Sequence, residues 1–165
     1  MVDETLVDAT PDIAVLVTRE EGRWDLTALP VRVGGDLATF LDALRAQPAE
    51  SGAIGLATYG DAFFLALRVT GGDVRMLISD AAAAADWPIA EDVLEELDVP
   101  LPDEDEEDAA PAGDLGIFAD LGMQPMDMSM LCDDDDLYPD EMLGTIATRL
   151  GFGPAFEGVL DGARG

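Results

Sequence analysis

The sequence contains no histidine and no lysine, and its 8 basic residues are all arginines. Without histidine, the usual general base near neutral pH is missing, and Ser-His or Cys-His nucleophilic pairs cannot form. Without lysine, Schiff-base chemistry and the phosphate-binding Gly-x-x-x-x-Gly-Lys loop are excluded as well. Paired carboxylates are the acid-base chemistry that remains open. We therefore predict that the chain is not an enzyme and needs no cofactor.

Cysteine is nearly absent too, because Cys132 stands alone. One thiol excludes an intramolecular disulfide and is typical of a reducing compartment. The acidic run at 133–136 follows it, and this negative charge disfavours the thiolate, so we expect a buried, unreactive thiol. No apolar run approaches the roughly 18 residues that span a bilayer, and the acidic N-terminus does not resemble a secretion signal. These features predict a cytoplasmic protein.

Acidic residues dominate the composition, with 36 Asp and Glu and a net charge of −28. Such self-repulsion opposes folding, yet 48% of the residues are hydrophobic and the mean hydropathy is +0.14, so a core can form. Phosphate and anionic lipid should repel this chain, because binding to either depends on clustered Lys and Arg. We predict a folded protein that binds neither nucleic acid nor membrane directly and whose partner is basic.

Residues 1–99 predict an α+β domain with a mostly antiparallel five-stranded sheet and two helices. Apolar residues at helical spacing between Asp36 and Pro48 indicate one helix, and those at 88–97 indicate another. Apolar runs separated by short Gly-containing turns indicate antiparallel strands. The run at 63–67 is almost entirely apolar, which favours a strand covered by helices on both faces. The predicted strands are 13–20, 24–30, 53–59, 63–70 and 74–79.

Residues 100–114 predict an acidic flexible linker, because six consecutive carboxylates at 103–108 lie between prolines. Neither this run nor the one at 133–136 has the spacing and glycine of a calcium loop, so we expect both to stay solvated without a metal ion. The remaining residues, 115–165, predict a small helical segment. Pro139 and Gly151 mark the start and end of one helix, and Pro154 opens a second, which together form a helical hairpin.

Methionines cluster just before the second acidic run. They are Met123, Met126, Met128 and Met130. Apolar residues at helical spacing are usually buried, so we favour core packing over a partner-binding surface, which methionine's flexible side chain would also suit. Trp24 and Trp87 are likewise expected to anchor the core.

The C-terminal part of the chain contains the motif Asp-Leu-Tyr-Pro-Asp-Glu-Met-Leu at 136–143, followed by Arg-Leu-Gly-Phe-Gly at 149–153. Further motifs are Leu-Ile-Ser-Asp at 77–80, Trp-Pro-Ile-Ala at 87–90, Ala-Gly-Asp-Leu at 112–115 and Ala-Asp-Leu-Gly at 119–122. Together they resemble the tRNA adenosine deaminase-associated proteins of actinobacteria, and the C-terminal motif is the most specific. The resemblance implies association with a deaminase but supplies no catalytic residues. The chain also lacks the His-x-Glu and Pro-Cys-x-x-Cys zinc signature of a deaminase itself.

Two functional hypotheses follow. The first is an acidic accessory or regulatory protein that binds a basic protein, possible partners being the tRNA adenosine deaminase or another basic protein. The alternative is a nucleic-acid mimic whose carboxylates occupy the partner's tRNA site. For either function, the predicted partner-binding residues lie in the C-terminal motif: Asp136, Tyr138, Asp140, Glu141, Arg149 and Phe152.

Overall fold

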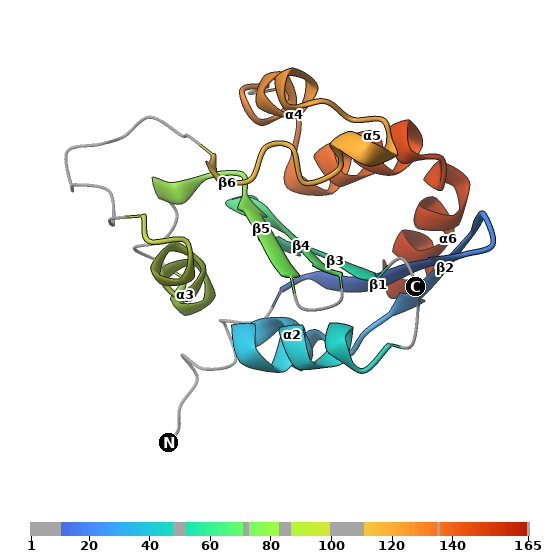
Figure 1. Cartoon of the computed structure of the whole chain (residues 1–165), viewed down its shortest axis with the longest axis horizontal. Coiled ribbons are helices and arrows are strands. Elements are labelled where there is room, and N and C mark those ends of the chain that lie inside the picture. The colour runs from blue at the N-terminus through green and yellow to red at the C-terminus, as the bar shows by residue number, and fades with distance from the viewer. Residues whose placement is uncertain are drawn as a thin grey trace.

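A six-stranded antiparallel sheet forms the centre of the described part of the molecule (Figure 1). This computed structural model describes residues 11–47, 52–70, 73–82, 87–99, 111–134 and 136–164. The strand order is β2-β1-β3-β4-β5-β6. The strands are β1 (Ile13–Glu20), β2 (Arg23–Ala28), β3 (Ala53–Tyr59), β4 (Phe63–Thr70), β5 (Asp73–Ile78) and β6 (Ala112–Gly113). The predicted α+β class is confirmed.

The sheet has one more strand than the five predicted. β6 pairs with the end of β5, where Leu77 lies opposite Gly113 and Ile78 opposite Ala112. A strand of two residues is too short to show an alternating pattern, so it falls within the segment interpreted as a linker. The rest of that linker, 100–110, lies outside the described residues. The predicted boundaries at 99 and 114 stay predictions.

Helices cover the two faces of the sheet (Figure 1). On one face lie α2 (Leu37–Arg45) and α3 (Pro88–Glu96), whose apolar residues share a core with Phe63 and Leu65. On the other lie α4 (Pro125–Cys132), α5 (Pro139–Leu150) and α6 (Gly153–Arg164), which share a core with Leu56 and Phe64. Every residue of β4 except its last is buried, as the apolar run predicts. Short 3₁₀ helices, η1 (Val31–Gly35) and η3 (Ala119–Leu121), precede α2 and α4.

Local chemistry explains where several elements begin and end. Glu21 and Gly22 join β1 to β2 with φ angles of 51° and 80°, as expected for a type I′ hairpin turn. The Asp36 carboxylate caps α2 by accepting a hydrogen bond from the Thr39 backbone N–H at 3.1 Å. Gly151 ends α5 with a φ of 110°, which favours glycine.

Both tryptophans pack against a core, as predicted, and the structure places them on opposite faces of the sheet. Trp24 is partly buried against the core that contains α5 and α6, and its ring centroid lies 4.8 Å from that of Phe152. Trp87 is partly buried on the other face, where it meets Tyr59 and Phe63 edge-on. The Tyr59 hydroxyl donates a buried hydrogen bond to the Gly34 carbonyl at 2.6 Å.

Candidate functional site

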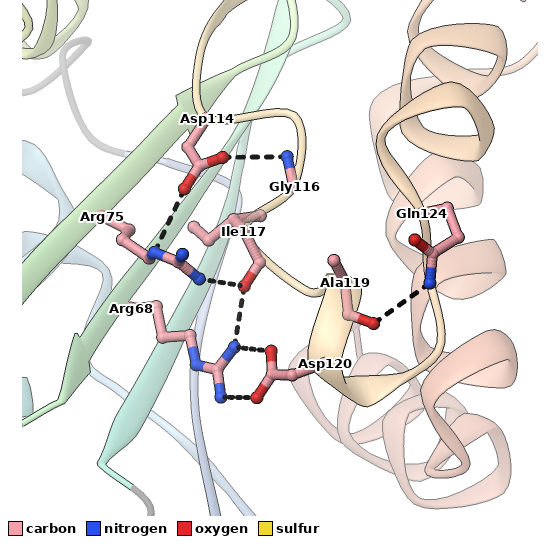
Figure 2. Close-up of polar contacts among 8 residues, drawn as sticks. All are labelled: Arg68, Arg75, Asp114, Gly116, Ile117, Ala119, Asp120 and Gln124. Carbon is pink, nitrogen blue, oxygen red and sulfur yellow. Dashed lines mark hydrogen bonds and ion pairs between the residues drawn. The ribbon is translucent and has the colours of Figure 1, made fainter.

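Two arginines face each other on neighbouring strands. Arg68 on β4 lies directly opposite Arg75 on β5. Like charges in this position destabilise a sheet unless each has a partner of opposite sign. The segment between β6 and α4 supplies those partners, because Asp114 and Asp120 project from it toward the two guanidinium groups (Figure 2).

Arg68 is the more deeply buried of the pair, at 8% exposure. Its Nη1 and Nη2 atoms donate to both carboxylate oxygens of Asp120, at 2.6 and 2.9 Å, and Nη1 also donates to the Ile117 carbonyl at 2.8 Å. Such a two-pronged pair is stronger and more directional than a single contact. The hydrogen bond from Arg68 lowers the pKa of Asp120, which keeps this carboxylate ionised.

Arg75 forms the second half of this arrangement. Its Nε lies 3.1 Å from Oδ2 of Asp114, whose Oδ1 accepts from the Gly116 backbone N–H at 2.9 Å. The Ile117 carbonyl accepts from Arg75 as well, at 3.5 Å (Figure 2). We call Arg68, Arg75, Asp114 and Asp120 the arginine-aspartate cluster. It ties the segment that leads into α4 to the central sheet.

A pocket of about 400 Å³ lies beside this cluster. Its volume is at the low end for small-molecule sites. Both of its arginines already have partners, since Arg68 is bound by Asp120 and the Arg19 guanidinium lies 5.0 Å from the centre of the Trp24 ring. We therefore assign no ligand to it. The lining residues are Val17, Arg19, Trp24, Gly52, Ile54, Arg68, Thr70, Asp120 and Leu121.

Three of the predicted partner-binding residues make contacts within the fold. Phe152 is 2% exposed and belongs to the core. Arg149 lies 2.7 Å from Asp127 and so joins the end of α5 to the start of α4. The Glu141 carboxylate accepts a hydrogen bond from the Tyr138 backbone N–H at 3.0 Å, which caps α5.

Exposure does not follow these contacts, because Glu141 and Arg149 are exposed as well. Asp136 is exposed, and the Tyr138 side chain is 59% exposed. Asp140 is half-buried in the first turn of α5. The structure therefore places Phe152 in the core and most of the other predicted residues at the surface, with Asp136 and Tyr138 on the α4–α5 connection. In the described part of the chain, no three Asp, Glu or Cys side chains gather into a metal site.

Comparison with known proteins identifies the family. The model for the Rv3753c-like tRNA adenosine deaminase-associated protein matches residues 12–153. This chain belongs to that family. It is 39% identical over 155 residues to Protein Rv3753c of Mycobacterium tuberculosis, which covers 92% of this chain and 90% of the relative. No solved structure matches the chain. No helix among the described residues is long and apolar enough to cross a membrane.

Two motifs that resemble this deaminase-associated family have a structural explanation. The motif at 112–115 contains β6 and Asp114, and the motif at 119–122 contains Asp120. Gly113 has a φ of 111° and lies so close to the Met76 carbonyl that a side chain would collide with it. Both motifs therefore hold the C-terminal segment against the sheet.

The methionine cluster divides between core and surface. Met123 and Met128 are 2% and 0% exposed, which confirms the predicted core packing for these two. The prediction is wrong for Met126 and Met130, which are 74% and 67% exposed. α4 carries apolar residues around most of its circumference, so periodicity could not identify the outward ones.

Oxidation should distinguish the two kinds of methionine. In native protein treated with dilute hydrogen peroxide, we expect sulfoxide at Met126 and Met130 well before Met123 and Met128, because reaction requires an accessible sulfur. Peptide mass spectrometry over a time course measures each rate. Protein unfolded in urea serves as the control, in which all four should react alike. Equal rates at Met128 and Met130 in native protein would contradict the assigned burial.

Proposed function

We propose that this chain is a non-enzymatic cytoplasmic accessory protein that binds a basic surface of a protein partner, the tRNA adenosine deaminase of the family description. The observation that carries the proposal is that arginines form ion pairs within the fold. In the described residues, Arg68, Arg75 and Arg149 are paired with Asp120, Asp114 and Asp127, and Arg45 with Asp42. Much of the small positive charge is thereby neutralised within the molecule, and the excess carboxylates remain to attract a cationic surface.

Crowding of carboxylates supports the same proposal. Asp92 on α3 lies on a groove with Asp36, Glu95 and Glu96. Its pKa is raised, first by partial burial and then by the charges of these neighbours and Glu91. Carboxylates that repel one another gain from a nearby cation, so binding of a basic surface relieves the repulsion. The same charges disfavour direct binding of nucleic acid.

A binding measurement across a salt series tests the proposal. Purified chain and purified deaminase should associate, with an affinity that falls as salt rises from about 50 to about 300 mM, because screening weakens charge attraction. The triple variant Asp92→Asn, Glu95→Gln, Glu96→Gln lowers the acidic charge by three and should weaken the salt dependence, because long-range attraction depends on the charge of the whole molecule. Absence of association at both low and moderate salt would exclude the proposed partner.

Adding tRNA separates an accessory role from mimicry. An accessory protein leaves binding of tRNA to the deaminase unchanged or improves it, whereas a mimic displaces the tRNA. Titration of the chain into a preformed deaminase–tRNA complex, followed by fluorescence anisotropy of labelled tRNA, reports which occurs. We expect the anisotropy to stay constant or rise. A fall to the value of unbound tRNA would replace the accessory role with mimicry.

A further inference from the structure

We propose that the outer face of α4 is a docking surface for a basic amphipathic helix. The identity of the partner rests on the proposed function. The surface itself is defined by the structure. Met126 and Met130 lie four positions apart on one side of α4, at 74% and 67% exposure. A helix on a protein surface normally presents polar residues to water, so two neighbouring exposed methionines mark a face suited to a partner.

The inner face of α4 is already occupied. Met128, Leu131 and Cys132 are buried in the core shared with the sheet. The helix is also held at its start, where the Asp127 carboxylate accepts from the Gln124 backbone N–H at 3.1 Å and pairs with Arg149. The outer methionines therefore stand on a fixed support, and docking need not order α4 first.

The shape of this surface favours a helix as its occupant. Side chains four positions apart form a ridge on a helix, and such ridges pack into the grooves of a second helix. Methionine is unbranched and flexible, so it adapts to the apolar side chains of different partners. An amphipathic helix with an apolar stripe offers a complementary surface.

The acidic residues around α4 indicate that the partner helix is basic and how it is oriented. Asp133, Asp134 and Asp136 are exposed just beyond the C-terminal end of α4. The helix dipole adds negative character at the same end. At the opposite end, the Asp127 charge is balanced by Arg149. The docked helix should therefore place its Lys and Arg residues beside the acidic end and its apolar stripe over the methionines.

Two residues predicted from the sequence lie next to this surface in the chain. Asp136 and Tyr138 belong to the connection between α4 and α5, and both are exposed. The C-terminal motif thus supplies part of the acidic end. The apolar contact comes from methionines that lie outside that motif.

A synthetic peptide tests the surface without the deaminase. The probe is a peptide of about 18 residues made of Lys and Leu at helical spacing, and its control has the same composition in scrambled order. Titrations at physiological salt, read by fluorescence anisotropy, should show that the patterned peptide binds about tenfold more tightly than the scrambled one. Circular dichroism should show that it becomes helical on binding. Equal affinity for the two peptides would overturn the inference, because charge alone would then explain binding.

Variants locate the binding surface. Met126→Ser with Met130→Ser should remove the preference for the patterned peptide, because the apolar contact is lost. Val31→Ser is the matched control, since Val31 is an exposed apolar residue on η1, at 43% exposure, and its loss should leave the preference intact. Asp133→Asn with Asp134→Asn should lower the affinity for the patterned and the scrambled peptide by the same factor. An unchanged preference in the methionine variant would place binding elsewhere and overturn the inference.

The same methionine variant distinguishes this inference from the proposed function. If the wild-type chain binds the deaminase and the variant binds it equally well, the accessory role stands and the α4 surface is excluded as its site. If the wild-type chain binds the patterned peptide but not the deaminase, the surface stands and the proposed partner is excluded. A urea midpoint equal to that of the wild-type chain confirms that the variant is folded.

Discussion

Replacing Asp120 with alanine should lower the free energy of unfolding by about 3 kcal/mol. The side chain of Arg68 is only 9% exposed, and Asp120 supplies its counter-charge through two hydrogen bonds. Without that carboxylate, the guanidinium stays buried with one carbonyl partner, that of Ile117. A buried charge that loses its counter-ion costs far more than a surface ion pair contributes. Urea denaturation at neutral pH measures the loss.

Substitution of the other partner, Arg68, is the matched control and should lower the free energy of unfolding by less. Arg68→Met removes the buried charge and keeps much of the apolar volume, while the Asp120 side chain, 59% exposed, remains hydrated. We expect a loss of about 1 kcal/mol. A loss in Arg68→Met equal to or larger than that in Asp120→Ala would contradict this assignment of buried and exposed partners.

Acid should remove the contribution of the same pair. Because its pKa is lowered in the folded protein, Asp120 stabilises the fold above its ordinary pKa of 3.8, and this stabilisation is lost as the pH falls through the lowered value. In the Asp120→Asn variant that part of the pH dependence disappears. The urea midpoints of the wild-type chain and the Asp120→Asn variant should therefore differ at neutral pH and become more similar as the pH is lowered.

Cys132 should react with Ellman's reagent about a thousandfold more slowly in the native protein than in urea at mildly alkaline pH. Burial, and then the neighbouring charge of Asp133, raise the pKa of its thiol from 9.0 to about 12. The reactive thiolate is correspondingly rare in the folded state. Absorbance measurements give the reaction rate in native protein and in urea, with stopped-flow mixing where the reaction is fast.

An exposed thiol on the same helix provides the control for this measurement. In a Cys132→Ser background, Met130→Cys places a thiol where the native side chain is 67% exposed. This thiol should react at a rate near that of the unfolded chain. Rapid reaction of native Cys132 itself would contradict its burial and the predicted inert role.

Local patterns predicted those elements whose signals lie within a few residues. Spaced apolar residues and the Asp36 cap indicated α2, and Pro139 and Gly151 marked the ends of α5. The pattern at 63–67 predicted a strand buried on both faces, because a strand between two helical layers needs apolar residues at every position. These features are properties of consecutive residues.

Features formed between distant residues could not be predicted in this way. Arg68 and Asp120 are 52 positions apart, and neither is distinguished locally from other arginines or aspartates. The resemblance did highlight Asp114 and Asp120 within motifs, but it did not indicate their partners. The motif containing Phe152 appeared suitable for binding, whereas the fold uses that side chain in the core. Exposure of Met126 and Met130 depends on how α4 is rotated against the sheet, which its mainly apolar sequence does not specify.

The position of the second helical layer has a consequence during protein synthesis. β1 to β5 precede α4, α5 and α6 in the chain, so the sheet face bearing Val15, Leu56 and Phe64 lacks these helices while translation is under way. Apolar faces left open in this way promote aggregation of nascent chains. Mutual repulsion between strongly acidic chains opposes such association. Residues 1–99 already contain 19 of the 36 Asp and Glu residues, so we expect this repulsion to act before the last helices emerge from the ribosome.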